Sequence, residues 1–154
     1  MTLPLRDREL TVTPFYRDEL VAVAPPEPRW RRHGPIRAVE LAEHPLILFD
    51  RGSTVRREID AWFARAQVTA RAAMELGNTE AMKKFVEAGP GLSVTSAFSV
   101  KADVAARRLA AMRLSPSLVR QIGLVRRRDK PLAPPLAAFL GALEDLRASL
   151  VRRR

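Results

Sequence analysis

The 154-residue sequence contains no cysteine, which excludes disulfide frameworks, thiolate zinc sites and cysteine nucleophiles together. It has only two histidines, His33 and His44, too few for a histidine-based metal site. No apolar run approaches the ~20 residues that a membrane-spanning helix needs. The first residues also lack the basic start and apolar core of a signal peptide. We therefore expect a soluble, cytoplasmic protein that carries no metal or other cofactor.

Motifs of the common enzyme classes are also missing. The sequence contains no GxGxxG, no Walker loop, no GxSxG and no HExxH. Asp50 and Glu75 could form a carboxylate pair, but no positioned nucleophile or base completes a catalytic site around them. We therefore expect a protein that is not an enzyme.

Acidic residues are scarce relative to basic ones: 17 Asp and Glu stand against 27 Lys and Arg, giving a formal net charge of +10. Such a charge favours anionic partners, such as nucleic acid, acidic lipid headgroups or carboxylate ligands. Arginine-rich clusters at residues 29–32, 126–128 and 152–154 could each contact phosphate. They could equally be solvated loops or frayed termini. The second interpretation is favoured because no alternation of basic and aromatic residues accompanies the clusters.

Hydrophobic patterning predicts alternating strands and helices. Strands are expected at residues 10–13, 20–24, 45–49, 72–76, 92–95 and 118–125. Pro14 and the polar residues 17–19 are expected to separate the first two strands. Helices are expected at residues 37–43, 54–66, 79–88, 100–109 and from Pro134 onward. This alternation implies parallel βαβ units with right-handed crossovers, and therefore an α/β fold.

Apolar positions on these helices predict which faces are buried. The helix at residues 54–66 carries a stripe of Val55, Ile59, Trp62, Phe63 and Ala66. The next helix is expected to turn Met82, Phe85 and Val86 inward. The last helix carries a longer apolar stripe, which consists of Leu136, Phe139, Leu140, Leu143, Leu146 and Leu150.

Three strand-to-helix turns, at residues 49–54, 77–79 and 95–98, are rich in small hydroxyl or amide side chains. Ligands of open α/β sheets bind at the carboxyl ends of the strands. The free N–H groups and the dipole at a helix start attract anions. This combination suits a small carboxylate or a similar polar anion. The alternative is that the polar residues of these turns only cap helices, and the residues alone do not decide between the two.

Three segments of the chain stand in a particular order and spacing: His44-Pro45-Leu46-Ile47, Gly52-Ser53-Thr54-Val55-Arg56 and Val86-Glu87-Ala88-Gly89-Pro90-Gly91-Leu92-Ser93-Val94. Together they resemble the effector-binding region of LysR-type transcriptional regulators. The opening residues 10–26 and the closing residues 121–143 support the resemblance, which covers nearly the whole chain. It implies a fold like the type II periplasmic binding proteins, in which two α/β lobes are joined by two crossover strands and an effector binds between them.

The resemblance implies one complete Rossmann-like lobe and a partial second one. Residues 1–28 would be a remnant of the first lobe with its crossover strand. Residues 29–116 would form the second lobe, and residues 117–154 the returning crossover strand and the C-terminal helix of the first lobe. We expect the second lobe, from about residue 35 to residue 115, to be well formed and the first-lobe remnant to be less stable.

Carried over from the family, the effector contacts would lie on seven residues of the second lobe: Asp50, Ser53, Thr54, Asn78, Thr79, Thr95 and Ser96. The helix at residues 54–66 resembles one that packs against a partner subunit, with Arg56, Arg57 and Asp60 on its exposed polar face. A homo-oligomer, or pairing with full-length regulator subunits, is therefore expected. The alternative is a monomer with that face solvated.

The expected function is effector sensing that controls transcription, through a small polar or carboxylate ligand, and we expect this effector to be anionic. Residues 1–154 contain no helix-turn-helix pattern, so we assign no DNA-binding residues, and DNA would be bound only through a domain outside this sequence. The sequence would then be a piece of a longer regulator or a short product that pairs with intact ones. A stand-alone cytoplasmic small-molecule-binding protein of the same fold is the alternative function.

Overall fold

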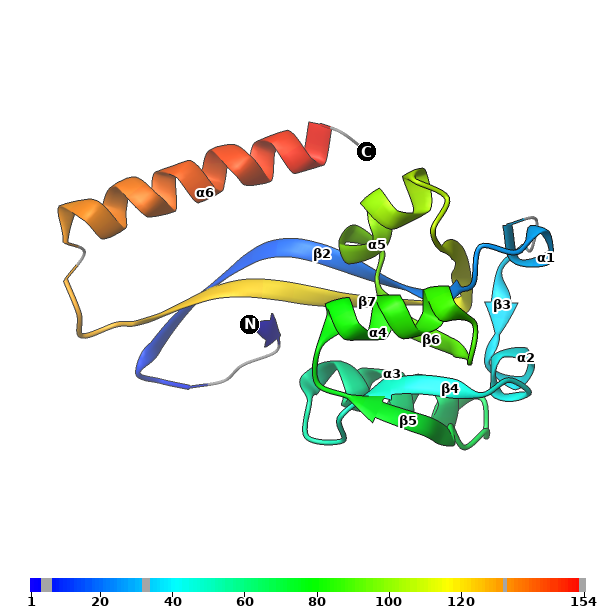
Figure 1. Ribbon diagram of the computed structural model, residues 1–154. Helices are drawn as coiled ribbons and strands as arrows, with labels where there is room; N and C mark the ends of the chain where they lie inside the picture. The colour runs from blue at the N-terminus through cyan, green and yellow to red at the C-terminus, as the bar shows by residue number, and fades with distance from the viewer. Residues whose placement is uncertain (4–6, 32–33, 132, 153–154) are drawn as a thin grey trace. The chain divides into compact units, whose positions relative to one another are not determined.

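Strands and helices alternate along the central part of the chain, as the hydrophobic pattern predicts (Figure 1). The computed structural model describes residues 1–3, 7–31, 34–131 and 133–152, and only the backbone of residues 149–152. The alternating elements are β4 (Leu46–Phe49), α3 (Thr54–Arg65), β5 (Ala72–Leu76), α4 (Thr79–Ala88), β6 (Leu92–Ser96) and α5 (Ala97–Ala105). The predicted strands and helices of this region are therefore confirmed, with α5 three residues earlier at its start than expected.

The sheet is parallel at its centre. β4 pairs in parallel with both β5 and β6, with Phe49 opposite Leu76 and Leu46 opposite Leu92. β2 (Leu10–Ala24) runs antiparallel to β6, and the strand order is β1-β7-β2-β6-β4-β5. Since the parallel strands point the same way, β4, β5 and β6 end at one edge of the sheet.

The long strand β2 corrects one prediction. Residues 10–13 and 20–24 belong to a single strand and are not separated at Pro14. Pro14 is exposed, and the register of β2 against β6 covers only Leu20–Val23. Pro14 therefore lies outside the stretch of β2 that pairs with β6, and its missing N–H removes no hydrogen bond from that pairing.

The second long strand, β7 (Ala110–Arg127), also exceeds its predicted length. Its early part pairs in parallel with β3 (Ile36–Arg37), and its later part pairs antiparallel with β1 (Thr2–Leu3). The remaining elements are α1 (Pro28–Arg31), α2 (Ala38–Ala42) and α6 (Pro134–Arg152). The short helix α2 and the long helix α6 were predicted, whereas α1, β1 and β3 were not.

The chain forms two compact units, and both passages between them occur inside the strands β2 and β7. Unit 1 consists of Met1–Arg17 and Arg120–Arg154, and unit 2 of Asp18–Val119. This division follows contacts within the chain. The assignment of residues 1–28, 29–116 and 117–154 to two lobes stays a prediction.

The apolar core belongs to unit 2. Every fully buried apolar side chain among the described residues lies between Leu20 and Leu118. From α3 the core takes Ile59, Trp62 and Phe63, and Val55 packs against it, as predicted. Ala66 is exposed, so this end of the predicted stripe is wrong.

The inward face of α4 needs a second correction. Met82 and Val86 are fully buried, but Phe85 is 40% exposed. Met82 and Val86 are four residues apart and lie on one side of the helix. Phe85, three residues after Met82, lies at the border of that side, where the sheet no longer covers it.

Candidate functional site

The three polar turns predicted from the sequence, at residues 49–54, 77–79 and 95–98, lie at the edge where β4, β5 and β6 end. Each turn leads directly into a helix of unit 2: α3, α4 and α5. Because β2 runs antiparallel to β6, the part of β2 just before Leu20 reaches the same edge. The edge therefore collects side chains from four strands.

The turn after β4 is built around Ser53. Its hydroxyl oxygen accepts a hydrogen bond from the Arg56 N–H at 3.1 Å, and its own N–H donates to the Asp50 carbonyl at 2.9 Å. Ser53 is thus the N-cap of α3. The Thr54 hydroxyl accepts a hydrogen bond from the Arg57 guanidinium at 3.3 Å.

The turn after β5 is built around Asn78. Its side-chain oxygen accepts from the N–H groups of Glu80 and Ala81 at 2.8 and 3.0 Å, so Asn78 is the N-cap of α4. The prediction left open whether Asn78 or Thr79 caps the helix, and Thr79 is instead its first residue. Two of the first-turn donors are therefore already satisfied by the protein.

The first two turns are in contact with each other. A Cβ atom added to Gly77 would stand 2.6 Å from Oδ2 of Asp50, closer than any side chain can be placed. A larger residue at position 77 would displace the Asp50 carboxylate, which packs directly over the backbone of the neighbouring turn.

The turn after β6 differs, because the side chain of Ser96, the residue at the N-cap position of α5, does not bond to the start of that helix. The Ser96 hydroxyl donates a hydrogen bond to Oδ1 of Asp18 at 2.5 Å and makes no hydrogen bond to the first turn of α5. Asp18 is 3% exposed and Thr95 is 2% exposed. A buried carboxylate from β2 therefore stands beside the start of α5, a place where the helix dipole favours negative charge.

Asp18 is a site residue that the sequence analysis missed. It lies in the polar stretch that was expected to interrupt two strands. Its neighbour Ser96 lies 78 positions along the chain. The only local signal was a pair of acidic residues, Asp18 and Glu19, before the apolar run at residues 20–24. Nothing local indicates the antiparallel register that brings Asp18 to Ser96.

Arg56 corrects the prediction for the exposed face of α3. It is 4% exposed, whereas Arg57 and Asp60 are exposed as expected. Its guanidinium donates to the Phe49 carbonyl at 2.7 Å, to Asp60 at 2.9 Å and to Glu75 at 3.1 Å. A buried guanidinium needs such acceptors, and two of them lie on the strands beneath the helix.

The charges around Arg56 shift its pKa and that of Glu75. Desolvation opposes the charge of Arg56, but hydrogen bonds to Asp60 and Glu75 outweigh it and raise the pKa of the guanidinium. The pKa of the Glu75 carboxyl is lowered by its hydrogen bonds with Arg51 and then Arg56. Glu75 is therefore held as a carboxylate by two arginines, rather than poised with Asp50 as an acid–base pair.

A second ion-pair group joins α4 to α5. Lys83 donates to Asp103 at 2.9 Å and to the Ser99 carbonyl at 3.3 Å, and Arg108 pairs with Asp103 at 2.6 Å. Lys83 and Asp103 are 11% and 13% exposed in their side chains. The pKa of Lys83 is raised by Glu80 and Asp103, and the pKa of Asp103 is lowered by Lys83 and Arg108.

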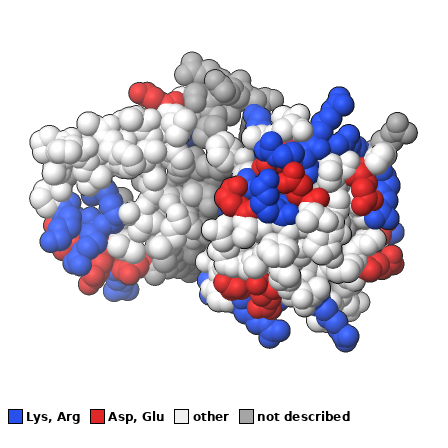
Figure 2. Space-filling model, viewed as in Figure 1, with Lys and Arg blue, Asp and Glu red and all other residues white. Residues whose placement is uncertain are grey.

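Basic residues do not form one continuous surface on the face in view. Figure 2 shows Lys and Arg in mixed clusters with Asp and Glu. Ion pairs account for some of this mixing: Arg127 pairs with Asp129, and Arg29 with Glu27. Arg32, Arg153 and Arg154 of the predicted basic clusters lie outside the described residues.

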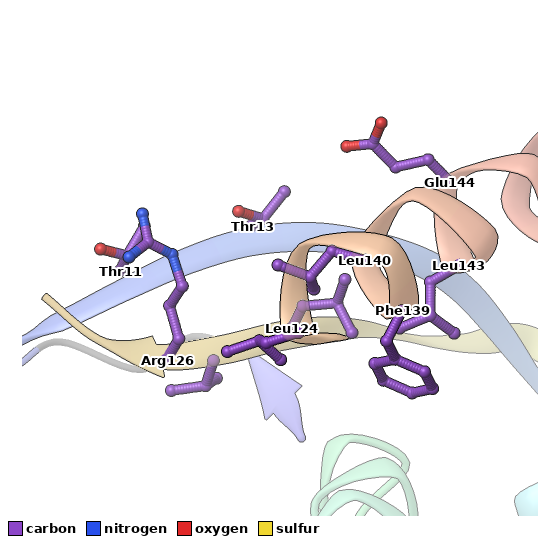
Figure 3. Close-up of a pocket in the computed structure, with 10 residues that line it drawn as sticks. Thr11, Thr13, Leu124, Arg126, Phe139, Leu140, Leu143 and Glu144 are labelled. Carbon is purple, nitrogen blue, oxygen red and sulfur yellow. The ribbon is translucent and has the colours of Figure 1, made fainter. Parts of the chain in front are cut away.

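Unit 1 contains a separate, largely apolar cavity of about 230 Å³, which the sequence did not predict (Figure 3). It lies against α6 and the parts of β2 and β7 that belong to unit 1. Its lining combines leucines and Phe139 with a polar rim, and consists of Thr11, Thr13, Leu124, Val125, Arg126, Leu136, Phe139, Leu140, Leu143 and Glu144. Such a lining suits apolar groups better than a small polar anion.

Within the described part of the chain, no group of three or more His, Cys, Asp or Glu residues is placed to hold a metal ion. None of the described helices is long and apolar enough to cross a membrane. The polar groups at this edge of unit 2 are hydrogen-bonding side chains and helix starts. Their arrangement can orient and hold a small polar molecule.

Comparison with known proteins gives a consistent result. Residues 1–148 match the family model described as the LysR substrate binding domain. The chain is 33% identical over 141 residues to the RuBisCO operon transcriptional regulator of Allochromatium vinosum, an alignment that covers 90% of this chain and 46% of that protein. With the regulator CbbR of Xanthobacter flavus it shares 35% identity over 134 residues, covering 85% of this chain and 40% of that protein. The chain thus spans less than half the length of these relatives.

Solved structures show the same fold. The CcmR regulatory domain of Synechocystis PCC6803, in complex with 2-PG, gives a TM-score of 0.82 at 24% identity and covers 95% of this chain and 71% of that one. The effector binding domain of QuiR, in complex with shikimate, gives a TM-score of 0.76 at 19% identity, with 99% and 70% covered. The predicted α/β fold of the periplasmic-binding-protein type is therefore confirmed.

Proposed function

Because this chain belongs to the family of LysR substrate-binding domains, we propose that it is the effector-sensing portion of a LysR-type transcriptional regulator. A small polar or carboxylate effector binds it, and binding changes the activity of the regulator. DNA is contacted through a helix-turn-helix domain outside residues 1–154. The chain works in the cytoplasm by binding a ligand, without catalysing a reaction.

The observation that carries this proposal is the convergence of three strand-to-helix turns at one edge of unit 2. The edge offers the hydroxyls of Ser53 and Thr54, the amide of Asn78 and the Ser96 hydroxyl. The starts of α3, α4 and α5 bring positive dipole ends to this edge, which favour an anionic group on the effector. QuiR, a structural neighbour with this fold, binds shikimate, which is itself a carboxylate.

The effector contacts we propose are those named from the sequence, at Asp50, Ser53, Thr54, Asn78, Thr79, Thr95 and Ser96. The lobes we propose are residues 29–116 for the second lobe, with residues 1–28 and 117–154 belonging to the first. Regulators of this kind act as oligomers, and we propose a homo-oligomer or an assembly with full-length subunits. Arg57 and Asp60 on the exposed side of α3 are available for that contact.

A substitution at Asn78 tests whether this residue contacts the effector or only caps α4. Asp caps a helix as well as Asn does, so Asn78→Asp keeps α4 capped but adds a negative charge at its start. We expect the thermal midpoint to stay within a few degrees. The affinity for an anionic effector should fall about tenfold or more, because the added charge repels it.

The measurement is isothermal titration of the full chain with 2-PG and with shikimate, the ligands of the two structural neighbours. Glu87→Gln is the matched control, since it changes one charge on the far end of α4. Equal affinity of the wild type and Asn78→Asp would make Asn78 a cap only. Binding of neither compound, nor of a wider set of small carboxylates, would contradict the proposed function.

A further inference from the structure

The turns after β4 and β5 are tied together by hydrogen bonds that meet at one acidic side chain. Oε1 of Glu75 accepts from Nη1 of Arg56 at 3.1 Å and from Nε of Arg51 at 3.2 Å. Arg51 belongs to the turn after β4, whereas Glu75 lies on β5, two residues before Gly77. One carboxylate oxygen on β5 thus holds both the turn after β4, through Arg51, and the first turn of α3, through Arg56.

Arg56 extends this connection into the backbone. Its guanidinium donates to the carbonyl of Phe49, the last residue of β4, at 2.7 Å. Its N–H donates to the hydroxyl of Ser53 at 3.1 Å. Arg56 therefore holds both ends of the turn after β4, and through Glu75 it also holds β5.

A direct contact reinforces the tie. Phe49 is opposite Leu76 in the β4–β5 register, so Asp50 and Gly77 follow at neighbouring positions. The Asp50 carboxylate stands 2.6 Å from the place that a Cβ of residue 77 would occupy. The two turns cannot slide past each other without breaking this packing.

The turn after β6 is anchored elsewhere. Ser96 is bonded to Asp18 on β2, and neither residue is a partner of Arg56 or Glu75 in any described bond. The nearest link between α4 and the following helix is Lys83, which reaches Ser99 and Asp103 one turn beyond the start of α4. The third turn is therefore anchored to β2 through Asp18, and the helix that follows it is joined to α4 through Lys83, so neither depends on the Arg56–Glu75 pair.

We propose that Arg56 and Glu75 are positioning residues that lock the turns after β4 and β5 into one rigid platform. This platform fixes the distance between Ser53 and Asn78, and with it the size and spacing of the polar groups that an effector must present. The role as a ligand-facing platform rests on the proposed function. The rigidity itself is a property of the free chain and is tested without a ligand.

From the chemistry of the Arg56–Glu75 pair we expect that lysine cannot replace Arg56. A guanidinium presents a planar fork of donors, which here meets Phe49, Asp60 and Glu75 at once. A lysine ammonium is a compact charge on a flexible stem, and it cannot donate to all three acceptors in those directions at once. Arg56→Lys therefore keeps the charge and loses the geometry, while Glu75→Gln keeps the shape and loses the charge.

The test is amide hydrogen exchange of the full chain, read residue by residue by NMR in the absence of ligand. In both Arg56→Lys and Glu75→Gln, we expect exchange to accelerate about tenfold at residues 50–54 and at residues 77–81 together. Residues 92–96 of β6 and the body of α5 should keep the wild-type rates. The matched controls are Arg65→Lys on the exposed side of α3 and Glu87→Gln on α4, and neither should change either turn.

Two results would overturn the proposal. One is acceleration confined to a single turn, which would mean that the turns move independently. The other is equal acceleration throughout unit 2, which would make the pair a general contributor to stability. The effector titration then answers a separate question. If 2-PG or shikimate binds the wild type, Arg56→Lys should weaken binding at least tenfold relative to Arg65→Lys. If neither compound binds, nor any of a wider set of small carboxylates, the proposed function fails, while the exchange pattern still decides whether the platform exists.

Discussion

Single residues that act locally could be predicted from the sequence. Asn78 was one of two expected caps, and its side chain does accept the N–H groups of Glu80 and Ala81. Ser53 was considered as a cap for the same reason and caps α3. In both cases the acceptor and its donors lie within three positions, so the rule for helix starts suffices.

Single residues whose partners lie far along the chain could not be predicted. Arg56 is expected on an exposed face because its helix resembles one that packs against a partner subunit. Its burial depends on the Phe49 carbonyl and on Glu75, which lies 19 positions away across a strand pairing. The Asp18–Ser96 bond is hidden for the same reason, since it depends on an antiparallel register.

Asp103 makes the stability of the protein depend on pH. Its pKa lies below the ordinary value of 3.8, because Lys83 and then Arg108 stabilise the carboxylate. A carboxyl whose folded-state pKa is lowered stabilises the fold above its unfolded pKa, and this contribution is lost as the pH falls through the folded pKa. We expect Asp103→Asn to cost about 1–2 kcal/mol of unfolding free energy near neutral pH, and progressively less as the pH falls through the lowered pKa of Asp103.

Urea unfolding at several pH values measures this difference. Asp129→Asn is the control, because Asp129 forms an ion pair with Arg127 in which both side chains are more than half exposed. That substitution should change the unfolding free energy by less than about 0.5 kcal/mol at any pH. A constant gap between wild type and Asp103→Asn from neutral to acidic pH would show that the ion pair is not the source of the stability.

At the scale of elements, period and capping signals were sufficient for the alternating strands and helices from β4 to α5. The helix α3 buries Ile59, Trp62 and Phe63 at the helical spacing, and β4 is buried along its whole length. The lengths of β2 and β7 were not predictable. Polar residues and prolines interrupt their hydrophobic pattern, and pairing with distant strands keeps these residues extended.

At the scale of the whole molecule, apolar burial is unevenly distributed. All fully buried apolar side chains of the described residues belong to unit 2, whereas three large ones on α6 are exposed: Leu136 at 42%, Phe139 at 58% and Leu146 at 48%. Full burial of each such side chain would contribute about 1.5–3 kcal/mol. Unit 1 is therefore stabilised much less than unit 2 by the burial of apolar side chains.

This difference predicts unequal protection from hydrogen exchange. We expect amides of α6, at residues 136–150, to exchange at least ~100-fold faster than those at residues 47–63 in β4 and α3. The measurement is hydrogen exchange of the full chain followed by mass spectrometry. Equal protection of the two segments would mean that α6 is as well supported as the core of unit 2.

The measurement that tests the central claim most directly is an NMR titration of the full chain with 2-PG and with shikimate, which locates the bound ligand. The account predicts that amide signals shift chiefly at residues 50–54, 77–79 and 95–96, where the parallel strands end. Shifts centred instead on the apolar cavity beside α6, at Leu140 and Leu143, would place the effector site in unit 1 and contradict it. An absence of any shift across a broad set of small carboxylates would contradict effector sensing itself.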